Sequence, residues 1–366
     1  MTLPLDSAWR DEFVARLLAW GADQRSHLPW RAADDDGRRD PYRVWVAEIM
    51  LQQTGVTTVG PYYDRFLARF PTVAALAAAP VDDVLKVWQG LGYYARARHL
   101  HRAAQIIVAE HGGRVPSDTD ALARLPGIGR YTLGAILSIA FGQPAPILDG
   151  NVRRVLARVF AIADNVRAPA IERRLWALSE ALVPLAAPGA FNEALMDLGA
   201  TICIPARPRC LACPVMSLCQ GRAMGIQDEL PARPPRRQTP HYDVTAGVIW
   251  RGDEFLVAQR PLDKMLGGLW EFPGGKCDPG EALADCLRRE LREELAIEVE
   301  VGDAVTVVRH AYTHFRITLH AFHCRIVGGE PQTLEVAAIA WTTLADVDRF
   351  AMAVTDQRIL AALRRS

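Results

Sequence analysis

Four cysteines beyond the middle of the chain constrain its fold more than any other feature. Cys203, Cys210, Cys213 and Cys219 follow the spacing C-x6-C-x2-C-x5-C, so four thiols fall within seventeen residues. This density predicts a metal centre, because disulfide frameworks belong to secreted chains and the first residues, MTLPLDSAWRDEF, lack the plan of a signal peptide. A structural zinc site more often has two C-x2-C pairs, whereas four thiolates suit a [4Fe-4S] cluster.

The length of the chain predicts more than one domain, and the lack of a long apolar run predicts a soluble, cytoplasmic protein. The 366 residues exceed a typical single domain, half of them are apolar, and no apolar run of about 18 residues predicts a membrane span. The net charge is zero, yet residues 1–225 carry 25 Lys and Arg against 21 Asp and Glu, whereas residues 243–366 carry 14 against 19. Since only three residues are lysines, we expect any phosphate contacts to be made mostly by arginine.

Residues 1–225 predict an all-α domain. Apolar residues recur at helical spacing from Trp9 and Phe13 onward. Ser117, with Asp120 three residues later, predicts the start of a short helix in the middle of this domain. The cysteine loop, residues 203–219, lies at its end.

A carboxylate lies in the middle of one predicted helix, YRVWVAEIMLQQT. Asp40 and Pro41 supply an N-cap and a first-turn proline for this helix. Glu48 has mostly apolar neighbours one turn away in either direction. Desolvation there would raise its pKa and let it hold a proton near neutral pH, as a general acid must. A glutamate paired with an arginine across a helix interface is the alternative.

The stretch from Leu125 to Asn151, LPGIGRYTLGAILSIAFGQPAPILDGN, joins a glycine turn, a helix and a carboxylate. Gly127 and Gly129 let backbone N–H groups turn outward where the helix opened by Arg130 begins, which suits a phosphate. Asp149 follows that helix, just ahead of a second amphipathic run. An ordinary helix–helix turn is the alternative for LPGIG taken alone.

The last third of the chain predicts a separate α+β domain. Residues 226–242 are rich in proline and arginine, lack periodicity and predict an extended linker. Residues 243–366 then predict strands around one helix, residues 281–295. On this helix Glu290, Glu293 and Glu294 are spaced i, i+3 and i+4, so they share a face where Mg²⁺ or Mn²⁺ could bridge a diphosphate. Arg289 could orient Glu281.

Several motifs together resemble one family of DNA repair enzymes over about residues 8–360. LPGIGRYT with the downstream ILDGNV is similar to the helix-hairpin-helix and Gly/Pro-Asp signature of base-excision DNA glycosylases, and WVAEIMLQQT resembles the catalytic helix of MutY-type adenine DNA glycosylases. The cysteine spacing resembles the loop that this family shares with endonuclease III, which favours iron–sulfur over zinc. GKCDPGEALADCLRRELREELAI resembles the Nudix pattern, with Ala296 where glycine is usual.

The resemblance implies a monofunctional adenine DNA glycosylase. Glu48 would protonate N7 of an adenine extruded from a pair with 8-oxoguanine or guanine, and Asp149 would stabilise the cationic sugar. Tyr131 stands where endonuclease III has the lysine that attacks the sugar, so no strand cleavage is expected. The implied adenine pocket comprises Trp30, Arg31 and Glu193. The implied DNA contacts are Gln53, Thr54, Leu91, Tyr93, Gly127, Gly129, Thr313 and His314.

The same resemblance implies that residues 243–366 read 8-oxoguanine. Tyr312, Thr313 and His314 stand where the family often has Phe-Ser-His. The family usually lacks the three glutamates of the Nudix box, so a retained nucleotide diphosphohydrolase activity and an ancestral remnant both stay open. The expected partner is duplex DNA containing A:8-oxoG or A:G pairs, met by a cytoplasmic, nucleoid-associated monomer.

Three alternatives to an adenine glycosylase stay open on the sequence. Another glycosylase of the superfamily, such as a thymine-mismatch enzyme, fits the cysteines and the hairpin but not WVAEIMLQQT or the fused second domain. A Nudix hydrolase with a DNA-binding module would make Glu48 dispensable. A non-catalytic sensor of DNA damage would bind without releasing a base.

Overall fold

The computed structural model describes residues 6–22, 24, 28–232 and 239–365. The chain forms two compact units, one of residues 1–77 and 102–236 and the other of residues 78–101 and 237–366. Part of the predicted linker, residues 233–238, lies outside the described residues. Within the described ranges, no helix is long and apolar enough to cross a membrane.

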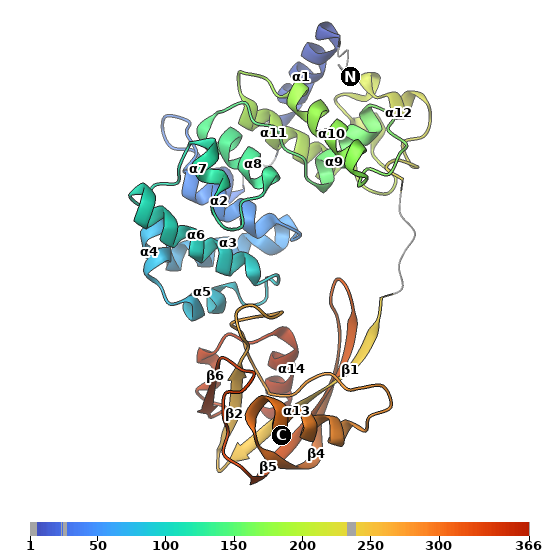
Figure 1. Cartoon of the computed structure of the whole chain (residues 1–366). Coiled ribbons are helices and arrows are strands. Elements are labelled where there is room, and N and C mark those ends of the chain that lie inside the picture. Colours follow the sequence, from blue (N-terminus) through green and yellow to red (C-terminus); the bar gives the residue numbers. More distant parts are fainter. Residues whose placement is uncertain (1–5, 23, 25–27, 233–238, 366) are drawn as a thin grey trace. The chain divides into compact units, whose positions relative to one another are not determined.

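Helices make up the chain up to residue 223, as predicted (Figure 1). The α-helices are α1 (Ser7–Gly21), α2 (Pro41–Leu51), α3 (Val56–Arg69), α4 (Val73–Ala78), α5 (Val81–Trp88), α6 (Ala95–His111), α7 (Thr119–Ala123), α8 (Arg130–Phe141), α9 (Gly150–Val159), α10 (Pro169–Leu182), α11 (Pro188–Asp197) and α12 (Gln220–Ala223). Short 3₁₀ or π turns are η1 (Pro29–Arg31), η2 (Leu198–Ile202), η3 (Cys210–Ala212) and η4 (Met216–Leu218).

Aspartates cap the helices around the site. The Asp40 carboxylate accepts the backbone N–H of Tyr42 at 2.8 Å, as predicted for α2. The predicted Ser117 cap of α7 is wrong, because Asp118 accepts the N–H of Ala121 at 2.8 Å and the helix begins one residue later. A carboxylate also interacts favourably with the helix dipole, which a serine hydroxyl does not.

Helix α8 lies very close to the segment that leads to Asp149. A Cβ atom on Gly134 would lie 2.0 Å from the carbonyl oxygen of Pro146, so only glycine permits this approach. Asp149 itself caps α9, and the apolar face of α9 lies in the core that also takes residues from α1, α10 and α11. The position of the Asp149 carboxylate is therefore fixed by packing on both sides.

The C-terminal domain is a mixed sheet with helices, which confirms the predicted α+β class. Its strands and helices are β1 (His241–Arg251), β2 (Glu254–Gln259), β3 (Trp270–Glu271), α13 (Leu283–Leu295), β4 (Glu298–Ala311), β5 (Arg316–Gly328), β6 (Ala338–Thr342), η5 (Val347–Arg349) and α14 (Val354–Leu363). The strand order is β3-β2-β1-β5-β4 with β6 beside β2; β1 and β5 pair in parallel, and the pairs β1–β2, β2–β3, β2–β6 and β4–β5 are antiparallel. Strand β3 and helix α14 were not predicted from the sequence, and β1 begins inside the predicted linker.

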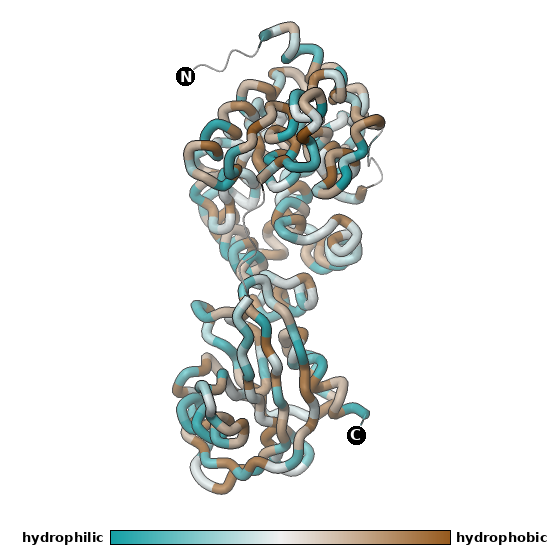
Figure 2. The backbone as a smooth tube through the Cα atoms, turned by 90° about the vertical axis from the view of Figure 1, so that its right-hand side faces the viewer, coloured by the Kyte–Doolittle hydropathy of each residue, from teal (hydrophilic) through white to brown (hydrophobic). Residues whose placement is uncertain are grey.

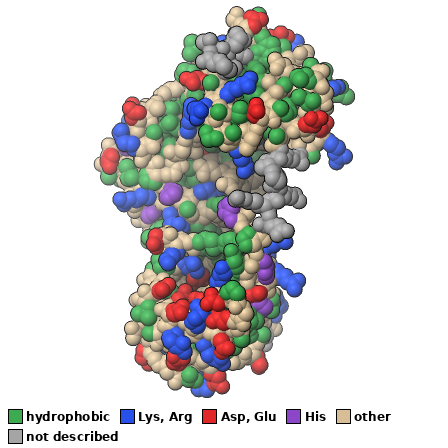
Figure 3. All heavy atoms as spheres, turned by 45° about the vertical axis from the view of Figure 1, so that its right-hand side comes forward, with side chains coloured by type: hydrophobic (Ala, Val, Ile, Leu, Met, Phe, Trp, Pro, Cys, Tyr) green, Lys and Arg blue, Asp and Glu red, His purple; other side chains and the backbone are tan. Residues whose placement is uncertain are grey.

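The two faces of this sheet form two cores. Along β2, Phe255 and Val257 lie in the core of Ile359 on α14, whereas Leu256 and Ala258 lie in that of Leu291 on α13. This alternation follows from the two-residue period of a strand. Hydrophobic stretches run along the strands in Figure 2, whereas acidic and basic side chains lie intermingled on the face of this domain that Figure 3 shows.

The residue that departs from the Nudix pattern ends α13 in a left-handed conformation. Ala296 is the C-cap, with φ 56° and ψ 32°. Glycine adopts this region without the clash that a Cβ atom brings, which is why it favours this position. The alanine keeps the geometry at a cost in backbone strain.

Replacing Ala296 with Gly is therefore expected to stabilise the C-terminal domain. Relief of the left-handed strain should raise the free energy of unfolding by about 1 kcal/mol. Ala284→Gly is the matched control, because this residue lies inside α13, where glycine costs about 1 kcal/mol. Urea denaturation followed by circular dichroism measures both. Equal destabilisation by the two substitutions would contradict the strain at Ala296.

Candidate active site

A buried carboxyl and a tyrosine form the centre of the site in the helical domain. Glu48 lies on α2 and is 5% exposed. The Tyr131 hydroxyl, from the first turn of α8, donates a hydrogen bond to its Oε2 at 2.7 Å and lies 3.2 Å from the Met196 sulfur. Burial raises the pKa of Glu48 to about 7; the charges of Glu193 and Asp149 add to this rise, and the Tyr131 hydrogen bond opposes it. Glu48 therefore holds a transferable proton near neutral pH.

The second carboxylate has a different environment. Asp149 accepts the backbone N–H of Val152 at 2.7 Å and the side-chain N–H of Asn151 at 3.1 Å. Burial raises its pKa, but these donors oppose the rise. Its position at the N-terminus of α9 also favours a negative charge. Asp149 is thus suited to stay ionised while Glu48 carries the proton.

A chain of hydrogen bonds joins Asp149 to the first cysteine. Asn151 donates to Asp149, and its Oδ1 accepts from Arg154 Nη2 at 2.9 Å. Arg154 Nε donates to the carbonyl oxygen of Cys203 at 2.7 Å, and its Nη2 to that of Gly199 at 2.6 Å. This link was not predicted, although Asn151 and Arg154 are three residues apart on α9 and therefore share one helix face.

The residues expected to form the adenine pocket lie together. Arg31 Nε is 3.2 Å from Glu193 Oε1, and Arg31 Nη1 donates to Asp197 Oδ2 at 2.7 Å. Trp30 is 7% exposed, and its ring meets that of Tyr63 edge-on at 5.5 Å between centroids. The charges of Arg31 and Glu193 both act on the pKa of Glu48, so this cluster adjoins the acid. The sequence analysis missed Asp197, one turn after Glu193 on the same face of α11.

The expected DNA contacts of the helical unit lie in turns. Gln53 is exposed, with φ 57°, and follows α2 together with Thr54. Gly127, with φ 82°, and Gly129, the N-cap of α8, form the exposed hairpin turn. A left-handed non-glycine residue such as Gln53 is strained, and such strain concentrates at functional sites.

The remaining DNA candidates belong to the second compact unit. Leu91 is only 6% exposed, whereas Tyr93 is 43% exposed and has φ 49°. Thr313 and His314 are exposed in the turn between β4 and β5. The Tyr93 hydroxyl lies 2.6 Å from Thr313 Oγ1. The structure thus brings two of these residues together and leaves Leu91 in the core.

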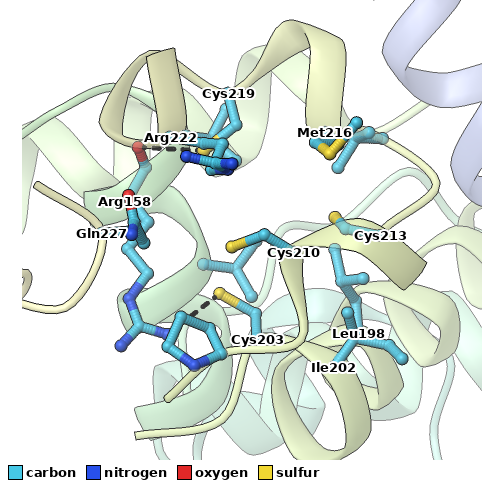
Figure 4. A pocket seen from close by; sticks show the side chains of 14 residues that line it. Arg158, Leu198, Ile202, Cys203, Cys210, Cys213, Met216, Cys219, Arg222 and Gln227 are labelled. Carbon is cyan, nitrogen blue, oxygen red and sulfur yellow. Dashed lines mark hydrogen bonds between the residues drawn. The ribbon is translucent and has the colours of Figure 1, made fainter. Parts of the chain in front are cut away.

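All four cysteines line one largely apolar pocket (Figure 4). No three His, Cys, Asp or Glu side chains among the described residues are grouped to hold a single metal ion. Four thiols around a shared pocket suit a larger group, and an iron–sulfur cluster takes four cysteines. Burial raises the pKa of Cys213 to about 12. The residues present fit a [4Fe-4S] cluster.

A cavity of about 450 Å³ lies in the C-terminal domain beside the Nudix box. Glu290 and Glu294 line it. Glu293 is half exposed and forms an ion pair with Arg289. Arg289 donates two hydrogen bonds of 2.9 Å to Glu281, which confirms the predicted pair. Burial raises the pKa of Glu294 to about 7. The other lining residues include Arg260, Glu271, Gly274, Gly275, Lys276, Tyr312, Phe315 and Asp356.

Comparison with known families defines the class of protein. Residues 46–181 match the HhH-GPD superfamily of base excision DNA repair proteins, and residues 245–362 match the NUDIX domain. A solved structure described as a thermostable thymine-DNA glycosylase is 32% identical, with a TM-score of 0.53, over 59% of this chain and 98% of that chain. The chain is a helix-hairpin-helix base excision repair protein with a Nudix domain.

Similar proteins narrow this class to one family. Adenine DNA glycosylase of Homo sapiens is 35% identical over 401 residues, which cover 95% of this chain and 73% of the human protein. Adenine DNA glycosylase of Buchnera aphidicola subsp. Schizaphis graminum (strain Sg) is 43% identical over 262 residues, 71% of this chain and 74% of that protein. The chain belongs to the adenine DNA glycosylase family, which confirms the resemblance found in the sequence.

Replacing Glu48 with Gln is expected to remove a pH-dependent loss of stability. Because its folded pKa of about 7 exceeds the ordinary 4.5, the folded state binds more protons between these values, and the free energy of unfolding falls as pH rises. At pH 8 the variant should be more stable than the wild type by about 3 kcal/mol, at about 1.4 kcal/mol per pKa unit. At pH 4 this difference should vanish.

Urea denaturation at the two pH values measures this effect. Glu110→Gln is the control, because Glu110 is exposed on α6. A stability difference between Glu48→Gln and the wild type that is the same at both pH values would show that the Glu48 pKa is not raised.

Proposed function

We propose that this protein hydrolyses the N-glycosidic bond of adenine mispaired with 8-oxoguanine or guanine in duplex DNA. The observation that carries the proposal is the pair of unlike carboxyls. Glu48 is buried, with a pKa of about 7, and Asp149 is supported by N–H donors at a helix N-terminus. Such a pair separates a proton donor from a charged stabiliser. Membership in the adenine DNA glycosylase family supports the same assignment.

In the proposed mechanism adenine is flipped out of the duplex towards Trp30, Arg31 and Glu193. Glu48 donates its proton to N7 of the base, which turns adenine into a neutral leaving group. The glycosidic bond then breaks with positive charge developing on the sugar, and the Asp149 carboxylate stabilises that charge. Water adds to the sugar, its released proton returns to the Glu48 carboxylate, and the hydrolysis is complete.

The proposed enzyme removes the base without cutting the strand. A bifunctional glycosylase uses an amine to form a Schiff base with the sugar. Tyr131 has no amine, and its hydroxyl is held by Glu48 at 2.7 Å. By donating to the carboxylate, Tyr131 keeps the Glu48 pKa near neutrality instead of higher, so the acid can also lose its proton.

We further propose that Cys203, Cys210, Cys213 and Cys219 hold a [4Fe-4S] cluster. When bound, the cluster supplies a fixed centre around which the loop folds, and glycosidic hydrolysis needs no electron from it. The link through Asn151 and Arg154 would transmit the position of this loop to Asp149. The cysteines are thus proposed to support the geometry of the site.

The turn between β4 and β5 is proposed to read the oxidised base opposite adenine. Thr313 offers a hydroxyl, and its contact with the Tyr93 hydroxyl places two polar groups at one point. Both residues are exposed and can reach a ligand outside the fold. We propose that the protein acts as a nucleoid-associated monomer in the cytoplasm, bound to duplex DNA.

A second candidate function concerns the cavity beside the Nudix box. Its volume of about 450 Å³ is that of a small-molecule site, and two glutamates line it with Lys276 and Arg260. Carboxylates of this kind hold Mg²⁺ or Mn²⁺ on a diphosphate. We propose that Glu290 and Glu294, with Glu293 at the rim, could hold such an ion for hydrolysis of an oxidised nucleoside triphosphate.

Adenine release from an A:8-oxoG duplex tests the main proposal. Glu48→Gln should slow release by roughly 10²- to 10⁴-fold, the usual contribution of a general acid, while duplex binding is retained. Glu110→Gln should release adenine at the wild-type rate. Base release by the Glu48 variant at the wild-type rate would exclude the mechanism, and efficient borohydride trapping of a protein–DNA adduct would exclude monofunctional hydrolysis.

Hydrolysis of 8-oxo-dGTP by the full-length protein with Mg²⁺ tests the second candidate. The wild type should release pyrophosphate, and Glu294→Gln should lose this activity, because Glu294 lines the cavity. Glu330→Gln, at an exposed loop position, is the control. Pyrophosphate release by the wild type no greater than by Glu294→Gln would reject a hydrolase site and leave the glycosylase proposal untouched.

A further inference from the structure

We propose that Arg158 is a positioning residue of the cysteine centre, which fastens the cluster loop to α9 and raises the reduction potential of the bound cluster. The proposal rests on the [4Fe-4S] cluster proposed above. It concerns a residue that neither the sequence motifs nor the catalytic mechanism uses.

The Arg158 side chain is buried and fully engaged with the loop. It is 1% exposed, and Nη1 donates to the Cys203 sulfur at 3.3 Å (Figure 4). The same nitrogen donates to the carbonyl oxygen of Ile204 at 2.7 Å, and Nη2 donates to that of Pro205 at 3.2 Å. Nε donates to the carbonyl oxygen of Leu230 at 2.9 Å. One guanidinium group thus binds residues 203–205, which precede Cys210, Cys213 and Cys219, and Leu230, which follows them.

The backbone of Arg158 meets the last cysteine. The Cys219 sulfur lies 3.4 Å from the carbonyl oxygen of Arg158. A Cβ atom on Gly221 would lie 2.5 Å from the same oxygen, so glycine is needed for α12 to come this close. Two of the four cysteines, the first and the last, therefore contact one residue.

Arg158 lies on the same helix, α9, that Asp149 caps. Helix α9 begins at the Asp149 cap, and Arg158 lies in its last turn. Arg154 ties the first half of the helix to Cys203, and Arg158 ties its end to the same cysteine. The helix that presents the catalytic anion is thus fixed to the cluster loop at two points.

Electrostatics determines the sign of the effect on the cluster. Four thiolates give the bound cluster a net negative charge in a largely apolar pocket. A buried cation and an N–H···S hydrogen bond both withdraw electron density from the ligating sulfur and stabilise the reduced state. Arginine suits this position better than lysine, because its planar group can reach one sulfur and three carbonyl oxygens together.

The test uses full-length protein purified with its cluster. Iron content and visible absorption first establish whether the wild type holds the cluster. Arg158→Met should then show a lower reduction potential and lose its visible absorption in air roughly tenfold faster, in line with the usual effect of removing an outer-shell partner. Arg158→Lys keeps the positive charge but lacks the planar guanidinium group. Its reduction potential and its rate of absorption loss should lie between those of the wild type and Arg158→Met. Arg173→Met removes an exposed arginine from α10 and should match the wild type.

A wild-type potential and decay rate in Arg158→Met would overturn the proposal. Should that variant not retain the cluster, resonance Raman spectra of the wild type and Arg158→Lys in H₂O and D₂O decide. The iron–sulfur stretches of the wild type should shift on deuteration, and those of Arg158→Lys should shift less; equal shifts would overturn the proposal. A wild type without iron would overturn the cluster assignment itself, while adenine release tests the glycosylase proposal separately.

Discussion

The burial of one carboxyl group is the constraint on which the helical domain depends. Glu48 lies inside α2 with 5% exposure, and the packing of α2 against α8 keeps water away from it. The same packing brings the Tyr131 hydroxyl to 2.7 Å, which prevents the carboxyl from being an isolated polar group in the core. Burial and this one donor together keep the pKa near neutrality, where a group can both give and recover a proton.

Helix α9 connects the chemistry to the cysteine loop. Its N-terminus holds Asp149, and two arginines, Arg154 and Arg158, attach it to the carbonyl and sulfur atoms of Cys203. Each arginine also binds other backbone oxygens, so the loop and the helix form one hydrogen-bonded body. The position of Asp149, the proposed catalytic anion, and that of the cysteine loop, the proposed cluster site, therefore depend on each other.

The C-terminal domain has two candidate sites, the turn between β4 and β5 and the cavity beside α13. The turn that contains Thr313 extends from β4 and β5 and presents exposed polar groups, as a reader of an exposed base requires. The carboxylates of Glu290 and Glu294 line the cavity beside α13, whereas Glu293 lies outside it and is half exposed. Tyr312 and Phe315 line this cavity and flank Thr313 and His314 in the chain, so the turn and the cavity adjoin each other.

Local pattern alone determined the all-α and α+β classes, the Asp40 cap of α2, the Glu281–Arg289 pair and the family, because each depends on spacing within a short segment. The cap of α7, strand β3 and helix α14 were not predicted, since a two-residue strand and competing caps have weak local signals. Only the tertiary structure decided that Tyr131 donates to Glu48 and that Arg158 reaches Cys203. These contacts join residues 83 and 45 positions apart, and no local rule of spacing brings such distant side chains together.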